Sequence, residues 1–465
     1  MGKLITSAGS IYDAVTSGTS KIVNKAVDKH ICIGVTGFSR SGKSTFITSL
    51  IHQLTYSNEA KLGGFLPARD EKIIGTKLLP IPGLELFDYE AGINALAGDP
   101  PKWPEPTASL SGCIVEITYK RDSFIKSVIG EQTTLRIEIR DYPGEWLLDI
   151  PLLNQDYHSW CRDMEGILHQ PKRKALMGSL FDDLKEIKPF DIISEDEIND
   201  IYGRFKAFLV TCKDEGLTLI QPGHTLLPGK DDSFEPFFPL MNMHHYSVKA
   251  LKKADKDCVY KVMLKRYKDY LKNVVDPFYK DYFKSVERQI IMVDTLKALS
   301  QGKDNFDDMM SSFSRIIDCY SYGENGFFRR LISPKIERIL FLSSKPDRVL
   351  SSQHDNLRHF TNNVIKRVCT QSIRNTIQIE TEIACAVRCT EDKSDYLTGK
   401  TAEGFGRLTH PAVPDKIPKN DEWGAFEGWR PPELIPPLNT DLKHGSNLPC
   451  IRMDTVLKNL IGDKF

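Results

Sequence analysis

Residues 37–44 read GFSRSGKS and carry residue types that bind phosphate, in the spacing G-x-x-x-x-G-K-[S/T]. Gly37 and Gly42 permit backbone angles that other residues avoid, so successive N–H groups can face a polyphosphate. Lys43 is expected to reach the β- and γ-phosphates of a nucleotide. The Ser44 hydroxyl is expected to bind a magnesium ion that bridges the same two groups. The stretch therefore predicts a nucleotide-binding site.

This phosphate loop needs a strand before it and a helix after it, and the sequence predicts both. Residues 31–35, ICIGV, form an apolar run of strand length. Apolar residues then recur at helical spacing through residues 47–54, and the N-terminus of that helix adds a favourable dipole. The rest of the loop is expected to contact the nucleotide as well, through Ser39, Arg40, Ser41 and Thr45.

A second constellation lies at the end of a predicted hairpin, whose strands are ASLSGCIVEITYK and TTLRIEIRD. Asp141 ends the second strand and Gly144 follows it, in the pattern D-x-x-G. An aspartate in this place can hold magnesium through a water, while the glycine N–H meets the γ-phosphate. Loss of that phosphate would release the loop, so the pattern predicts a switch. An ordinary turn is the alternative.

Such a switch usually has a second arm, a threonine that binds magnesium only when the γ-phosphate is present. Thr107, in WPEPTASL just before the first hairpin strand, stands in that place. The prolines around it favour an extended, accessible segment. Thr76, in the glycine-rich segment 63–83, is the competing candidate.

The choice of base is predicted by ERILFLSSKPD, where a buried-strand pattern runs into Lys345 and Asp347. An aspartate carboxylate can accept from both N1–H and N2–H₂ of guanine, and a lysine stem can lie over the base plane. Adenine lacks both donors and would leave Asp347 unpaired. The alternative is a helix start, with Ser344 as the cap and Pro346 in the first turn.

Taken together, these motifs resemble a Ras-like P-loop GTPase with a Walker A loop, and more narrowly the YcjX-like family of bacterial, stress-associated nucleotide-binding proteins. GFSRSGKS, DYPGEW, RQIIMVD and SSKPD carry the resemblance over most of the chain. It implies GTP or GDP with Mg²⁺ as ligands, a cytosolic protein and a membrane-protein partner. It also implies backbone contacts with guanine O6 after the strand in TEIACAVRCTED, from Ala386, Val387 or Arg388. Ser344 departs from the usual Asn or Thr, which removes a side-chain tie to the phosphate loop.

The expected fold is α/β, a Ras-like P-loop domain. Its mostly parallel sheet has helices on both faces and one antiparallel hairpin strand, and it carries an inserted all-helical subdomain. RQIIMVD lies far beyond the D-x-x-G motif, and the interval is helical in pattern, with a capping box at Ser194 and Glu197. A near-match to the phosphate loop from Gly223, GHTLLPGKD, has the wrong spacing and is interpreted as a loop. The expected parts are an N-terminal amphipathic helix, two halves of the nucleotide-binding domain around the insert, and an irregular C-terminal extension: 1–29, 30–148, 149–286, 287–396 and 397–465.

Hydrolysis needs an oriented water and positive charge on the transition state. Ras-like proteins commonly use a glutamine after D-x-x-G for the first; here Glu145 stands there, which predicts slow turnover because a carboxylate adds negative charge beside the phosphates. Arg40 can supply the second need. Guanylate-binding and atlastin-like GTPases carry an arginine at this loop position, which implies an internal finger that self-association brings into place. An arginine packed outward on an acidic neighbour is the alternative.

Composition limits the remaining choices. Lysine plus arginine and aspartate plus glutamate both number 62, so no overall charge attracts nucleic acid. The ten cysteines are scattered singly and suggest neither zinc nor a disulfide framework, in keeping with a reducing cytoplasm. No apolar run approaches the roughly 20 residues that span a bilayer. The helix predicted within residues 1–29 either packs on the body or lies on a membrane surface, so peripheral contact with the inner membrane is one expectation.

Three functions stay open from the sequence. The first is a slow, magnesium-dependent GTPase switch whose helical insert passes nucleotide state to a partner, or that dimerises with nucleotide. The second is a P-loop ATPase or kinase with the insert as a lid. The third is a nucleotide-bound scaffold with negligible turnover, which Glu145 favours.

Overall fold

The computed structural model of the chain describes residues 29–38, 40–57, 62–106, 109–120, 131–230, 233–321, 335–369, 374, 377–419, 421–426 and 428–465. The predicted N-terminal helix, residues 1–29, lies outside the described residues except for Lys29, which begins the first strand. Two predicted site residues, Ser39 and Thr107, also lie outside them.

A mixed, mostly parallel sheet forms the centre of the molecule, in the order β2-β4-β5-β1-β6-β7-β8, with β3 beside β4. Strands β5, β1, β6, β7 and β8 run parallel to one another, whereas β4 runs antiparallel to β5 and forms the predicted hairpin with it. The strands are β1 Lys29–Gly37, β2 Ile73–Leu79, β3 Glu85–Leu86, β4 Ser111–Lys120, β5 Gln132–Asp141, β6 Arg288–Val293, β7 Arg338–Ser344 and β8 Gln378–Ala384.

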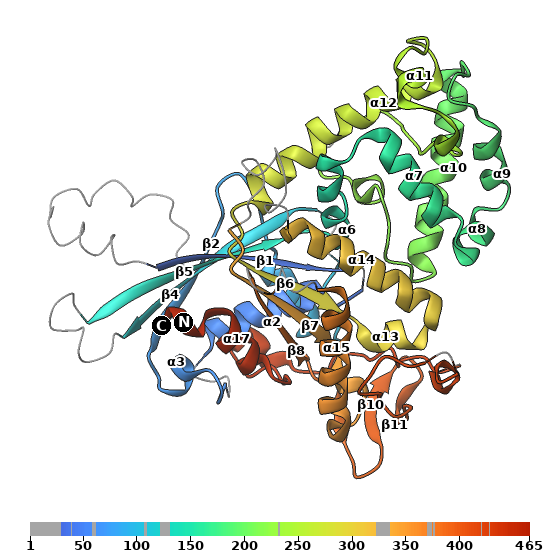
Figure 1. Ribbon diagram of the computed structural model, residues 1–465. Coiled ribbons are helices and arrows are strands. Elements are labelled where there is room, and N and C mark those ends of the chain that lie inside the picture. Colours follow the sequence, from blue (N-terminus) through green and yellow to red (C-terminus); the bar gives the residue numbers. More distant parts are fainter. Residues whose placement is uncertain are drawn as a thin grey trace, which may run out of the picture.

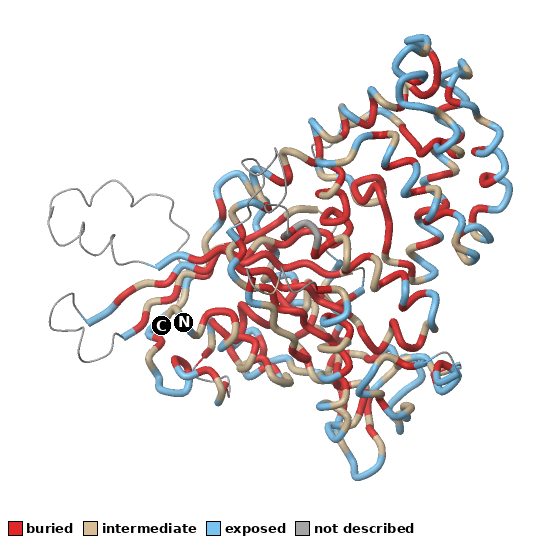
Figure 2. Tube along the Cα trace, viewed as in Figure 1, coloured by how far each residue is buried: buried red, intermediate tan, exposed pale blue. Residues whose placement is uncertain are grey.

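Helices cover both faces of this sheet (Figure 1). Alternate residues of a strand point to opposite faces, so Ile31 and Ile33 join one core and Cys32 joins the other. Helices α2 (Lys43–Thr55) and α17 (Met453–Ile461) pack on the first face. Helices α14 (Lys303–Ser321) and α15 (His354–Val368) pack on the second. The predicted fold class is thereby confirmed, and Figure 2 shows the buried layer running through the sheet.

The interval between β5 and β6 forms a helical lobe that projects from one end of the sheet (Figure 1). A short helix, α6 (Gly144–Leu147), leads from the D-x-x-G motif into this insert. The Ser194 hydroxyl accepts a hydrogen bond from the Glu197 N–H at 3.2 Å, which caps the longest helix of the lobe. The lobe's helices are α7 Tyr157–Leu168, α8 Pro171–Met177, α9 Ser179–Glu186, α10 Glu195–Asp214, α11 Val248–Lys252 and α12 Val259–Tyr270.

Apolar residues of the insert belong to the same core as the second face of the sheet, so the lobe packs against the nucleotide domain through a shared core and is not joined to it by linkers alone. A buried ion pair reinforces this junction, because Arg173 of α8 lies 2.5 Å from Asp308 of α14. The Asp308 carboxylate also accepts from the Thr218 and Leu219 N–H groups after α10. Shorter helices elsewhere complete the nucleotide domain: α3 Leu66–Arg69, α4 Tyr89–Leu96 and α13 Thr295–Ser300.

The C-terminal extension is more regular than its composition predicts. A small antiparallel sheet joins β9 (Thr390–Asp392), β10 (Leu397–Thr401) and β11 (Gly404–Leu408), and α17 lies near the end of the chain. The expectation of an irregular segment over 397–465 is therefore wrong for β10, β11 and α17. A proline- and glycine-rich stretch separates β11 from α17, and its composition favoured an irregular structure. The apolar residues of α17 nevertheless recur at helical spacing and pack into the sheet core. No helix among the described residues is long and apolar enough to cross a membrane.

Candidate functional site

One cavity of about 590 Å³ collects most of the predicted site residues at the carboxyl end of the parallel strands. The phosphate loop forms one wall, and the segments after β7 and β8 form another. The predicted residues that line it are Gly37, Arg40, Ser41, Gly42, Lys43, Ser44, Thr45, Glu145, Lys345, Asp347, Ala386 and Val387. Parallel strands end at the same edge, which is why motifs far apart in sequence meet here.

The phosphate loop has the backbone that its glycines predict. Gly42 has φ of 89° and precedes α2, and Arg40 also lies in the left-handed region, with φ of 65°. A Cβ on Gly37 would lie 2.4 Å from the Ser41 hydroxyl oxygen and 2.9 Å from the Met292 carbonyl oxygen, so no side chain fits there. Gly42 is the N-cap of α2, and Lys43, Ser44 and Thr45 of its first turn line the cavity, so a helix N-terminus, whose first N–H groups have no partner within the helix, lies at the cavity wall.

Lys43 and Asp141 contact each other at the base of this loop. Lys43 Nζ lies 2.8 Å from Asp141 Oδ1 and donates to the Tyr142 carbonyl oxygen at 2.6 Å. Asp141 ends β5 and is fully buried behind the cavity wall. The oxygen donors Ser44 and Asp141 fit a hard cation such as Mg²⁺. A lysine that reaches bound phosphates must share or exchange its contact with Asp141.

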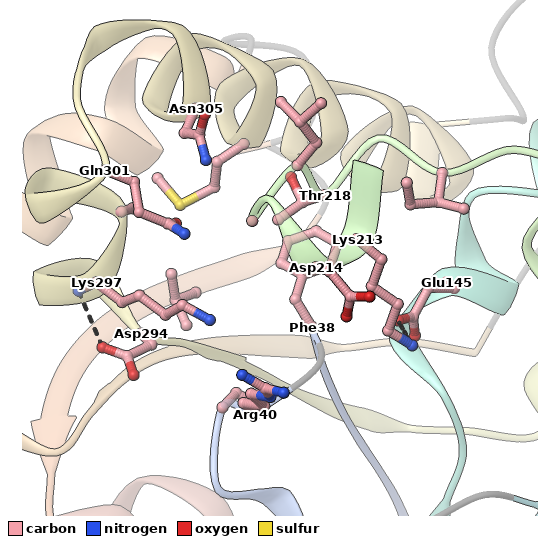
Figure 3. A pocket seen from close by; sticks show the side chains of 17 residues that line it. Phe38, Arg40, Glu145, Lys213, Asp214, Thr218, Asp294, Lys297, Gln301 and Asn305 are labelled. Carbon is pink, nitrogen blue, oxygen red and sulfur yellow. Dashed lines mark hydrogen bonds and ion pairs between the residues drawn. The ribbon is translucent and has the colours of Figure 1, made fainter. Parts of the chain in front are cut away.

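Gly144 packs directly on the phosphate loop, because a Cβ there would lie 2.7 Å from the Gly37 carbonyl oxygen. The next residue, Glu145, faces the cavity with only 5% of its side chain exposed. Its carboxylate pairs with Lys213 of α10, with Nζ at 2.9 Å from Oε1 (Figure 3). No local motif marks Lys213, which lies in the last turn of a helix in the insert.

Lys345 and Asp347, which follow β7, also line the cavity. Lys345 Nζ donates to the Arg40 carbonyl oxygen at 2.6 Å and lies 2.8 Å from Asp294, so it ties β7 to the phosphate loop. Burial raises the pKa of Asp294, but Lys345 and Arg348 outweigh that effect and leave it lowered. The Ser344 hydroxyl donates to the Val293 carbonyl oxygen at 3.2 Å and caps no helix.

The Asp347 carboxylate is almost fully buried and accepts from the Cys389 N–H at 3.0 Å. Burial raises the pKa of Asp347, and the Cys389 N–H partly opposes this rise. Cys389 itself lines the cavity and was missed, since nothing in the local sequence marks a backbone donor.

The segment after β8 lies where the resemblance implied, but not all of it faces the cavity. Ala386 and Val387 line it, and the Ala386 carbonyl oxygen accepts from Ser49 of α2 at 2.8 Å. Arg388 is directed elsewhere: its Nε donates to the Thr390 carbonyl oxygen at 2.8 Å, and it is not among the lining residues.

The C-terminal extension closes one side of the cavity, where Leu434 and Ile435 line it. Trp103 lies beside them and donates from Nε1 to the Leu434 carbonyl oxygen at 2.7 Å. Trp103 and the cavity-lining Pro106 come just before Thr107, which is outside the described residues. The competitor Thr76 sits within β2, where its hydroxyl donates to the Leu54 carbonyl oxygen at 3.2 Å, and it does not line the cavity.

Arg40 lines this cavity and also a smaller one of about 110 Å³, which Figure 3 shows. Asp294, Lys297 and Glu145 line the smaller cavity around it. Within the described residues the Arg40 guanidinium takes part in no ion pair. The alternative interpretation, an arginine packed outward on an acidic neighbour, therefore has no acidic partner among these residues. Burial and the nearby Arg40 charge both lower the pKa of Lys297, although Asp294 opposes them.

Comparisons with known proteins cover nearly the whole chain. A family model described as "YcjX-like family, DUF463" matches residues 31–465. A protein of Escherichia coli (strain K12) named "Ras-like GTPase YcjX" is 34% identical over 466 residues, which cover 96% of this chain and 98% of that protein. A protein of the same name from Shewanella oneidensis (strain MR-1) is 30% identical over 475 residues, covering 97% and 98%. The similarity therefore includes the helical insert as well as the nucleotide domain.

Proposed function

The chain belongs to the YcjX-like family, and from this premise we propose that it binds GTP with Mg²⁺, hydrolyses it slowly and acts as a nucleotide-controlled switch. One observation carries the proposal. A single cavity is lined both by the phosphate loop and by Lys345 and Asp347. Its volume of about 590 Å³ suits a nucleotide-sized ligand.

Guanine recognition rests on Asp347. Its buried carboxylate is positioned by the Cys389 N–H, and guanine presents two further donors in the plane of the base. Lys345 is pinned along the phosphate loop, so its stem can cover the base. The N–H groups after β8, near Ala386 and Val387, are candidates for the guanine O6 contact.

The triphosphate would lie along the N-terminus of α2, with Lys43 as its cation. Ser44 and Asp141, with Thr107 as a further candidate, would hold Mg²⁺, which neutralises phosphate charge when bound. The Gly144 N–H would donate to the γ-phosphate. Because Gly144 is in close contact with Gly37, α6 has little room to move independently of the phosphate loop. Turnover would be slow, because Glu145 replaces the usual glutamine. Arg40 is the proposed finger for the transition state.

The insert is the proposed transmitter of nucleotide state. It is continuous with α6, which follows the D-x-x-G motif, and its apolar residues share a core with the sheet. We further propose that the signal serves a membrane-associated stress response, with a membrane-protein partner and a cytoplasmic or peripheral inner-membrane location. These last points rest on the family resemblance alone.

The test is titration of the purified chain with fluorescent GTP, GDP and ATP in the presence of Mg²⁺, together with phosphate release. We expect GTP to bind more tightly than ATP. Asp347→Ala should weaken GTP binding about 10- to 100-fold, because a charged hydrogen bond contributes about 1.5–3 kcal/mol, and should leave ATP binding unchanged. Asp355→Ala, which removes an exposed carboxylate from α15, is the matched control.

Tight ATP binding that is unchanged by Asp347→Ala would contradict guanine recognition and favour an ATPase or kinase.

Arg40→Gly removes the guanidinium and suits the left-handed backbone at that position. If Arg40 is a finger, this variant should lower phosphate release at least tenfold while GDP affinity stays within about twofold. Unchanged phosphate release would exclude the finger.

A further inference from the structure

The Glu145–Lys213 pair joins the switch to the insert at the edge of the nucleotide cavity. Both residues line this cavity and also the smaller one beside it (Figure 3). Glu145 immediately follows the glycine proposed to meet the γ-phosphate, and it lines the cavity in which the nucleotide would lie. Lys213 is held at this place by α10, a helix of the insert.

A lone carboxylate in this place would be unfavourable for two reasons. Its side chain is only 5% exposed, and burying an unpaired charge is costly. It would also repel the phosphates beside it. Lys213 Nζ at 2.9 Å from Oε1 removes the net charge of the pair. A carboxylate has more acceptor sites than one ammonium contact fills, so it can still accept a hydrogen bond from water.

The insert also fixes the main chain of this segment. A Cβ on Gly223 would lie only 2.1 Å from the Glu145 carbonyl oxygen, so the insert's loop packs directly on that peptide. The next side chain, Trp146, stacks on His224 with centroids 4.3 Å apart and donates from Nε1 to the Leu227 carbonyl oxygen at 2.7 Å. Glu145 is thus held by the insert through both its backbone and its carboxylate.

We infer that Lys213 is a positioning residue for GTP hydrolysis, which neutralises Glu145 so that its carboxylate can hold the attacking water. This inference rests on the proposed function. In the step itself, the water oxygen forms a bond to the γ-phosphorus while the bond from that phosphorus to the β–γ bridging oxygen breaks. GDP leaves with the electron pair, and the water's protons end on inorganic phosphate and solvent. Lys213 acts through Glu145 and makes turnover depend on where the insert sits.

The pair can be tested by a double-mutant cycle on phosphate release from saturating Mg²⁺–GTP, using the full chain. Lys213→Met should lower turnover at least tenfold and leave GDP affinity within about twofold, since the proposed defect lies in the water's position. Lys213→Arg should restore most of the rate, because it keeps the charge. In a Glu145→Gln background, Lys213→Met should change the rate less than about threefold, because a neutral amide needs no counter-charge.

Lys206→Met removes an exposed lysine from the same helix and should leave turnover unchanged. If Lys213→Met does not unfold cooperatively, Lys213→Gln replaces it in the cycle. The inference would be overturned if Lys213→Met lowered the rate of phosphate release as much in the Glu145→Gln background as in the unmodified chain. It would also be overturned if Lys213→Met left the rate of the otherwise unmodified chain unchanged. An unmodified chain that binds GTP without hydrolysing it would overturn the inference but leave nucleotide binding in place. Absence of GTP binding would overturn the proposed function together with the inference.

Discussion

Asp347 is the residue on which base selectivity should depend most. It is buried at the edge of the cavity and accepts from the Cys389 N–H at 3.0 Å. Burial raises the pKa of Asp347 above its ordinary value. Only the ionised carboxylate can accept both hydrogen bonds that guanine donates. Bound guanine therefore favours the ionised form of Asp347, whereas burial favours the protonated form.

On acidification, the affinity for GDP should therefore begin to fall at a higher pH than it would if Asp347 had the pKa of an ordinary aspartate. The sign follows from the raised pKa: the carboxylate is ionised above it and accepts from guanine, whereas protonation below it removes an acceptor. The measurement is GDP affinity from neutral pH downward, with Asp347→Ala as the comparison. The variant's weaker affinity should change less over the same range, and parallel pH profiles for the two proteins would contradict this account.

Between the motif and the insert, the key element is the segment from α6 to Asp149. The Asp149 carboxylate is fully buried and accepts from the Gly223 N–H at 2.9 Å. It also contacts His224 Nδ1 at 2.8 Å and accepts from the Tyr270 hydroxyl at 2.6 Å. A single side chain thus ties the D-x-x-G segment to two separate parts of the insert.

Asp149→Ala should destabilise the chain by about 2–5 kcal/mol, because several buried donors would lose their acceptor at once. Urea unfolding followed by tryptophan fluorescence measures this, since Trp146 stacks on His224 in the same cluster. Asp200→Ala is the control: this carboxylate is 67% exposed in an i,i+4 pair with Arg204, so the change should stay within about 0.5 kcal/mol. Equal effects of the two substitutions would show that the cluster does not brace the junction.

Across the whole molecule, the C-terminal helix completes a face of the sheet that begins with the first strand. Buried residues of α17 share a core with Ile31, Ile33 and Val35 of β1. Arg288 of β6 reaches Asp463 through two hydrogen bonds and is itself buried. The Arg288 contact lowers the pKa of Asp463. The nucleotide domain is therefore built from both ends of the described chain.

Leu457→Ala should lower the free energy of unfolding by about 2–5 kcal/mol, since Leu457 is 1% exposed within this core. Lys458→Ala, at the adjacent exposed position of the same helix, should change it little. Thermal or urea denaturation compares the two variants. If nucleotide affinity also falls in Leu457→Ala but not in Lys458→Ala, packing of α17 supports the phosphate loop as well. Similar stability of the two variants would show that α17 is dispensable for the domain.

Local patterns gave most of the nucleotide domain in advance. The strand, loop and helix around residues 37–44, the hairpin ending at Asp141, and the strand running into Lys345 and Asp347 all depend on short-range backbone geometry. Residue type and spacing along the chain largely specify such local geometry. The regular elements of the C-terminal extension were not expected, because its proline and glycine content outweighed the short helical repeat of α17.

By itself, the sequence determined the order of the motifs and hence which kinds of contact a nucleotide should meet. Only the tertiary structure decided which residues from distant segments meet those motifs: Lys213 beside Glu145, the Cys389 N–H beside Asp347, and Leu434 beside Trp103. A motif needs fixed spacing along one stretch of backbone, so it can be read from the chain. A contact between distant segments has no fixed spacing, because sheet order and packing of the insert bring its two sides together.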